Sequence, residues 1–205
     1  MPSSPRTYPR STHITRRRRV VAIAAAALMI AVGTAITVQL TSPSDDALGA
    51  PVTLDMLGDD DGFLDTGDAI SAFANELPAI ADLDPALRDA MQAAARAASD
   101  DDVVFVVTSG WRSERYQQAL FDDAVREYGS AAEAAKWVAT PQVSKHVTGE
   151  AVDIGYTDAN SWLSQHGADF GLCQTYANEM WHFELATEPG GECPPQLSDA
   201  SEVSG

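Results

Sequence analysis

The chain has 205 residues, with 13 basic and 30 acidic side chains and a formal net charge of −17. A surface with this excess of carboxylates repels polyphosphates, so the composition argues against a nucleic acid partner. The charge identifies no substrate, because a strongly acidic surface also serves solubility alone.

The N-terminus concentrates positive charge ahead of a long apolar run. Six arginines lie within residues 1–19, and the next 19 residues carry no charge. Nineteen helical residues at ~1.5 Å each span the hydrocarbon core of a bilayer, and the arginines favour its cytoplasmic side. We therefore expect a basic cytoplasmic tail at 1–19, a transmembrane signal-anchor at 20–40, and the rest of the chain outside the cell membrane. Cleavage near Gly33 and Ala35 would instead give a secreted protein.

Residues 41–65 are rich in serine, proline, glycine and aspartate. Asp59, Asp60 and Asp61 stand in a row before Gly62. Such a segment has too few apolar side chains to offset the entropy cost of ordering, so we predict an acidic flexible linker. A calcium site is the alternative, but the sequence lacks a full EF-hand pattern.

The folded domain is predicted over 66–195, which is long enough for one hydrophobic core. Its first apolar residues with helical spacing indicate a helix over 68–80. Asp84 and Pro85 then supply an N-cap and a first-turn proline for a second helix over 86–98.

Short strands and helices are expected in the rest of the domain. The β-branched run 103–108 is typical of a buried strand, and 151–154 is a second one. Between them, Ser113 is a candidate N-cap for a helix that Gly129 ends. Alternation over 181–185 indicates a half-buried strand. The last residues, 196–205, are polar and are predicted to form a loose tail.

Two histidines and one aspartate form a candidate metal site. His146 precedes Asp153 by seven residues, and Glu179 precedes His182 by three. Two imidazoles and a carboxylate are a common ligand set for catalytic zinc, which keeps a fourth position open for water. Glu179 is the right type of residue to accept and return the proton of that water.

Arg112 is a candidate catalytic cation. It follows the strand predicted at 103–108, where a fixed guanidinium could bind a developing oxyanion or the terminal carboxylate of a substrate. The alternative is a structural ion pair with one of the many carboxylates.

Cys173 and Cys193 are the two cysteines of the chain. Both lie in the part expected outside the membrane, where oxidising conditions favour a disulfide over two free thiols. The bridge would close a loop that contains Glu179 and His182, with a stabilisation on the order of 3 kcal/mol in the chain-entropy estimate.

Three sequence motifs occur in order between residues 84 and 193. They are SGWRSERYQQALF, SKHVTGEAVDIG and NEMWHFEL. Together they resemble the zinc-dependent D-alanyl-D-alanine carboxypeptidases of the VanY type, in the M15 peptidase family. The resemblance implies zinc ligation by His146, Asp153 and His182, a catalytic base at Glu179, the motif arginine at Arg112, and positions near the substrate at Ser144 and Gln117.

The resemblance also implies a fold and a reaction. We expect an α+β domain, with a small, mostly antiparallel sheet, packed helices and a zinc cleft, and we expect a monomer. The implied reaction is hydrolysis of the terminal D-Ala-D-Ala bond of peptidoglycan stem peptides. The same site could instead serve an L,D-carboxypeptidase, a D,D-dipeptidase or a peptidoglycan endopeptidase. A non-catalytic cell-wall binding module is a further alternative, although binding alone does not require Glu179.

Overall fold

The structure is a computed structural model, which describes residues 52–65 and 69–203. Within these ranges the strands are β1 (Ile70–Ser71), β2 (Val106–Ser109), β3 (Ala151–Gly155), β4 (Leu172–Gln174) and β5 (His182–Leu185). The α-helices are α1 (Pro78–Ala81), α2 (Pro85–Asp100), α3 (Glu114–Tyr128), α4 (Ala131–Ala134) and α5 (Thr157–His166). Short 3₁₀ helices cover Leu54–Met56, Asp59–Asp61, Gly167–Phe170 and Ala200–Glu202.

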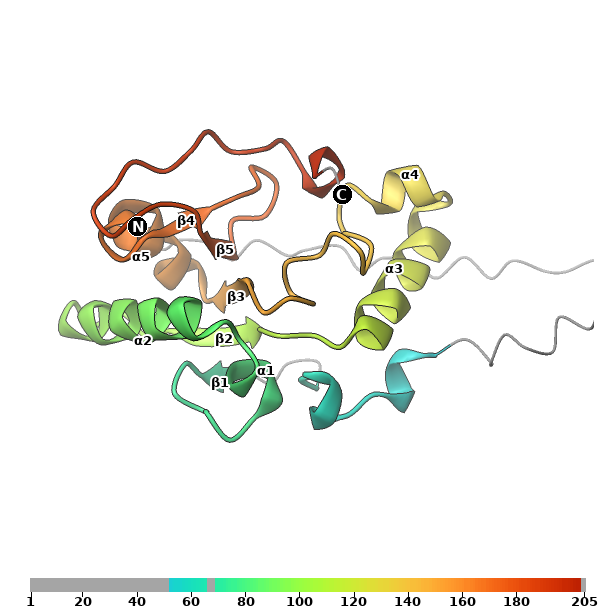
Figure 1. The fold of residues 1–205 in the computed structure, drawn as a ribbon, viewed down its shortest axis with the longest axis horizontal. Coiled ribbons are helices and arrows are strands. Elements are labelled where there is room, and N and C mark those ends of the chain that lie inside the picture. The colour runs from blue at the N-terminus through green and yellow to red at the C-terminus, as the bar shows by residue number, and fades with distance from the viewer. Residues whose placement is uncertain (1–51, 66–68, 204–205) are drawn as a thin grey trace, which may run out of the picture. The chain divides into compact units, whose positions relative to one another are not determined.

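The five strands form one antiparallel sheet in the order β1-β2-β3-β5-β4 (Figure 1). Helices α2 and α5 contact each other and the sheet, whereas α3 and α4 contact each other beyond the end of β2. This arrangement confirms the predicted α+β class with a small antiparallel sheet and packed helices.

The hydrophobic core lies between α2, α5 and the sheet. Helix α2 buries Leu87, Met91 and Ala94, which recur at helical spacing, and the sheet contributes Val152 and Phe183. Full burial of each large apolar side chain stabilises the fold by about 1.5–3 kcal/mol relative to exposure. This core holds β3 and β5 in fixed register.

The two long helices begin and end close to where the sequence predicts. The Asp84 carboxylate accepts a hydrogen bond from the Ala86 amide at the start of α2. The Ser113 hydroxyl accepts one from the Tyr116 amide at the start of α3, and Gly129 ends α3 with a φ of 81°. A left-handed φ of this size favours glycine.

The predicted helix over 68–80 is wrong. Ile70 instead lies in β1 and pairs with Val107 of β2, and a one-turn helix starts at Pro78. The apolar spacing therefore reflects a strand and a turn that pack on the same core. Pairing with a strand far along the chain is a tertiary interaction that local periodicity does not report.

The predicted membrane anchor and cytoplasmic tail lie outside the described residues. Over 52–65 and 69–203, no helix combines the length and hydropathy that crossing a bilayer requires. Neither the tail at 1–19 nor the segment at 20–40 is described by the structure.

The described end of the chain is ordered, in contrast to the loose tail expected at 196–205. The predicted disulfide between Cys173 and Cys193 is present. Beyond it, Leu197 forms a parallel bridge with Tyr176. The two residues on either side of Tyr176 complete this bridge with backbone hydrogen bonds to Leu197. The polar composition of this segment thus coexists with backbone pairing to the domain.

Part of the predicted acidic linker also packs on the domain. Asp61 is 3% exposed, and its carboxylate accepts hydrogen bonds from the Ser113 hydroxyl and the Arg115 guanidinium. The hydrogen bond from Arg115 is the main reason that the pKa of Asp61 falls to about 2. The expectation of a solvated segment therefore does not hold at Asp61.

Replacing Asp61 with alanine should lower the free energy of unfolding by about 1 kcal/mol at neutral pH, because the Ser113 hydroxyl loses its acceptor and Arg115 its partner. We expect no more than this because the Arg115 side chain is 54% exposed and solvent screens the pair. Asp60→Ala removes the same charge from an exposed neighbour and should change stability by less than about 0.5 kcal/mol.

The stability difference between wild type and Asp61→Ala should depend on pH. The folded-state pKa of about 2 lies below the ordinary value of 3.8. The stabilisation is therefore fully present above about pH 4 and is lost as the pH falls towards 2. Urea unfolding of both proteins across this range would measure it. A difference that stays constant down to pH 2 would rule out this account.

Candidate metal centre and active site

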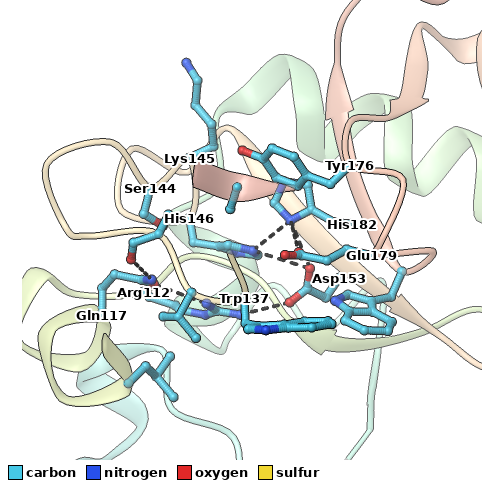
Figure 2. Close-up of a pocket in the computed structure, with 15 residues that line it drawn as sticks. Arg112, Gln117, Trp137, Ser144, Lys145, His146, Asp153, Tyr176, Glu179 and His182 are labelled. Carbon is cyan, nitrogen blue, oxygen red and sulfur yellow. Dashed lines mark hydrogen bonds and ion pairs between the residues drawn. The ribbon is translucent and has the colours of Figure 1, made fainter. Parts of the chain in front are cut away.

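Three predicted ligands converge at the centre of the sheet (Figure 2). The register of β3 against β5 places Asp153 directly opposite His182, and His146 lies in the loop that precedes β3. One ligand atom from each of these three buried residues lies within 4.8 Å of the other two. The cluster predicted from residue type and spacing is therefore assembled in three dimensions.

Hydrogen bonds assign the free nitrogen of each imidazole. His146 Nδ1 lies 2.8 Å from the carbonyl oxygen of Gly110, which can only accept, so Nδ1 carries the proton and Nε2 is free. His182 Nε2 lies 3.0 Å from the Glu184 carboxylate, which leaves Nδ1 free. Outer partners of this kind fix the tautomer and orientation of metal-binding histidines.

The third candidate ligand atom is a carboxylate oxygen that accepts no hydrogen bond from the described residues. Asp153 Oδ1 is buried without a hydrogen-bond partner of good geometry among the described residues. It lies 3.3 Å from His182 Nδ1 and 3.4 Å from His146 Nε2. Three convergent lone pairs in a buried place are costly unless a cation neutralises them. The donor set and its burial fit a divalent metal ion, and two nitrogens with one oxygen suit zinc.

The raised pKa of His182 also shows that the cluster favours a positive charge. Burial would lower the pKa of this imidazole, but the close carboxylates of Asp153 and Glu184 outweigh burial and raise the pKa to about 9. Without a metal ion the cluster thus draws a proton onto His182. Metal binding would compete with that proton, because the same lone pair serves both.

Glu179 is placed to move protons beside the cluster. Its carboxylate lies 3.8 Å from His182 Nδ1. Burial raises the pKa of Glu179 to about 7, against the opposing effect of positive charge on His182. A carboxyl group with this pKa can both accept and release a proton near neutral pH.

Arg112 forms the ion pair that was the alternative to a free catalytic cation. Its Nη2 lies 2.8 Å from Asp153 Oδ2, and its Nε donates to the Ser109 hydroxyl at 2.7 Å. Its Nη1 donates to Gln117 Oε1 at 3.1 Å. These contacts orient the metal-binding carboxylate so that Oδ1 faces the histidines. A guanidinium has five N–H donors, so Arg112 retains donors towards the cavity that it lines.

The two residues predicted near the substrate lie in the same cavity. Gln117 and Ser144 both line it, and both are buried. The Gln117 amide also donates to the carbonyl oxygen of Ala139 at 2.7 Å. Gln117 therefore positions Arg112 through one end of its amide and is held by the backbone at the other. Contact of either residue with a substrate stays a prediction.

Motif reasoning missed five residues of the cavity, which has a volume of about 170 Å³. Val138 and Ala139 are two of them, and the other three are Tyr176, Trp137 and Ala200. Tyr176 packs against the ring of His182 with a centroid distance of 4.9 Å. Trp137 lines the mouth and stacks on Tyr128, and Ala200 comes from the C-terminal segment. All five lie outside the three motifs, so only the fold brings them to the site.

Replacing Glu184 with glutamine should weaken metal binding by about 10–100-fold, a typical effect of changing the outer partner of a metal-binding histidine. The amide keeps the size of the side chain but removes the charge that favours a proton on His182 Nε2. Competition with a chromophoric chelator would measure the affinity. Glu150→Gln neutralises a carboxylate that pairs with Lys145 at the surface, and it should bind metal like wild type. Equal affinities of the two variants would contradict the assigned role of Glu184.

Comparisons with known proteins agree with this site. A family model described as VanY, D-alanyl-D-alanine carboxypeptidase, matches residues 81–189, which is more than half of the chain. A D-alanyl-D-alanine carboxypeptidase of Enterococcus faecalis (strain ATCC 700802 / V583) is 34% identical in a region that covers 42% of this chain and 42% of that protein. The match thus spans less than half the length of that relative.

Two solved structures are also similar. One is VanYB in complex with D-alanine-D-alanine, 30% identical, with a TM-score of 0.47 over 50% of this chain and 70% of that one. The other is a zinc-bound mutant of the vancomycin-resistance D,D-pentapeptidase VanY, 27% identical, with a TM-score of 0.49 over 57% and 77%. The matched residues include His146, Asp153, Glu179 and His182. The chain belongs to the VanY family of D-alanyl-D-alanine carboxypeptidases.

Proposed function

We propose that this chain is a zinc-dependent D,D-carboxypeptidase that removes the terminal D-Ala from peptidoglycan stem peptides ending in D-Ala-D-Ala. The observation that carries the proposal is the unpartnered, buried Oδ1 of Asp153, which faces two imidazole nitrogens beside Glu179. The family supports this choice of bond, as does the relative named D-alanyl-D-alanine carboxypeptidase.

His146, Asp153 and His182 would hold the zinc ion. When bound, zinc supplies a Lewis acid that polarises the scissile carbonyl and lowers the pKa of water to about 7. Glu179 accepts a proton from the attacking water while the water oxygen forms a bond to the carbonyl carbon. Glu179 then returns the proton to the amine nitrogen as the C–N bond breaks, so one carboxyl group serves both steps.

Polar side chains of the cavity would bind the free C-terminus of the substrate. The N–H donors that Arg112 retains after binding Ser109, Gln117 and Asp153 would bind the terminal carboxylate or the developing oxyanion. The Ser144 hydroxyl lines the same cavity and would add a donor. A requirement for that carboxylate distinguishes a carboxypeptidase from an endopeptidase.

The deciding experiment measures free D-Ala released from a pentapeptide that ends in D-Ala-D-Ala, using the full chain with zinc. We expect release that stops when a chelator is added and returns with zinc. The same assay on a peptide that ends in a single D-Ala after an L-residue tests L,D-carboxypeptidase activity. Release of D-Ala-D-Ala as a dipeptide, or of internal fragments without free D-Ala, would refute the proposal.

We further propose that the chain is a monomer anchored in the cell membrane by residues 20–40, with its catalytic domain outside. The uncharged run after six arginines supports this, and the Cys173–Cys193 disulfide suits an oxidising compartment. Protease added to intact cells should therefore digest the catalytic domain. Survival of the domain until the cells are lysed would contradict this topology, and light scattering of the purified chain would test its oligomeric state.

A further inference from the structure

One wall of the cavity comes from outside the family match. The match ends at residue 189, yet Ala200 lines the same cavity as the metal-binding residues. We call residues 193–203 the C-terminal strap. In Figure 1 this part of the chain, drawn in red, runs past the β4 edge of the sheet and ends near α4.

Two tethers hold the strap in place. Its first residue is bonded to Cys173 of β4 by the disulfide. Leu197 accepts a hydrogen bond from the Ala177 amide at 2.8 Å and donates one to the Thr175 carbonyl at 2.9 Å.

These tethers hold the backbone that precedes Ala200 against the domain. Ala200 is 5% exposed and starts the 3₁₀ helix Ala200–Glu202, next to Asp199. Two aromatic side chains that also line the cavity are more exposed, Trp137 at 47% and Trp181 at 41%. Such exposed side chains can change rotamer at low cost. The methyl group of Ala200 cannot withdraw without moving the tethered backbone.

We propose that Ala200 is a specificity-determining residue, whose methyl group limits the size of the substrate side chain that fits beside the metal centre. The inference rests on the proposed function and assigns peptides with small terminal side chains as its substrate class. The cavity that Ala200 lines has a volume of about 170 Å³. One methylene too many in an apolar pocket costs about 10–200-fold in kcat/KM.

Two substitutions of opposite size test this role. In Ala200→Leu an isobutyl group replaces the methyl, so kcat/KM for the D-Ala-D-Ala pentapeptide should fall at least about tenfold, mainly through a higher KM. In Ala200→Gly the wall recedes. The preference for a terminal D-Ala over a terminal D-Leu should then shrink by about tenfold. Both variants should bind zinc like wild type, because Ala200 is not one of the three proposed ligands.

Ser198→Leu is the matched control, since it adds an apolar side chain to the same strap at an exposed position. It should keep wild-type kinetics and selectivity. Thermal unfolding of each variant reports whether it folds. If the larger side chain prevents folding in Ala200→Leu, the glycine variant carries the test alone.

The possible outcomes separate the two proposals. A wild-type protein that cleaves its peptide, together with Ala200 variants that match Ser198→Leu in KM and selectivity, would overturn the role of Ala200 alone. Wild-type selectivity in a folded Ala200→Gly would do the same. A folded, zinc-loaded wild type that cleaves no stem peptide would overturn the proposed function and this inference together.

Discussion

Replacing Glu179 with glutamine should lower kcat for D-Ala release by about 10²–10⁴-fold, the usual contribution of a general acid–base group. The amide fills the same space but cannot accept the proton of water or deliver one to the leaving amine. KM should change little, because Glu179 acts in the chemical step rather than in peptide binding. Steady-state kinetics at saturating zinc would measure both constants.

The control for this experiment is Glu192→Gln, which neutralises an exposed carboxylate at the surface. It should retain wild-type kcat. Zinc content must also be equal in the two variants, so that loss of metal does not imitate loss of the base. If Glu179→Gln retained most of its kcat with full zinc, Glu179 would not be the acid–base group.

The same carboxyl group sets the direction of the pH dependence. Burial raises the pKa of Glu179 to about 7, and a general base works only when unprotonated. A bound dication would lower this pKa by Coulombic attraction, so the rising limb of kcat/KM should lie below about pH 7. We expect the pH profile of the residual activity of Glu179→Gln to lack this rising limb.

Replacing His146 with alanine should abolish D-Ala release and leave the protein without stoichiometric zinc. The substitution removes one of three ligands, so affinity should fall by more than the ~10–100-fold seen when an outer partner is lost. Elemental analysis after gel filtration would measure zinc content. Thermal unfolding offers a readout independent of activity, because zinc at ~100 times its Kd stabilises wild type by about 2.7 kcal/mol.

His166→Ala is the control for the loss of an imidazole. His166 ends α5 and packs on Trp162 with a centroid distance of 4.7 Å, and it is not part of the metal cluster. This variant should keep its zinc and its stabilisation by zinc. If His146→Ala were stabilised by zinc as much as His166→Ala, the ligand assignment would be refuted.

Local signals in the sequence predicted the parts of the fold whose interactions are local. The caps at Asp84 and Ser113 act within three residues, so the starts of α2 and α3 could be placed from the sequence. The alternation over 181–185 likewise located β5. In contrast, β1 depends on pairing with β2 and was mistaken for a helix, because its partner is far away in the chain.

The metal centre shows the same division. Residue types and spacing identified His146, Asp153, Glu179 and His182, because zinc chemistry demands particular donor atoms. The sequence could not decide which oxygen of Asp153 faces the histidines. That choice follows from Arg112, which lies 41 residues away and holds the other oxygen.

By itself, the sequence predicted the clustered donor set, the disulfide cysteines and the two long helices, and it singled out Glu179 as the proposed acid–base group. Only the tertiary structure showed the ion pair of Arg112, the burial of Asp61 and the place of Ala200 in the cavity wall. Asp61 reaches Ser113 across 52 residues, and Ala200 arrives on a strap of polar composition. Contacts over such separations depend on packing and backbone pairing, which leave no periodic pattern in the sequence.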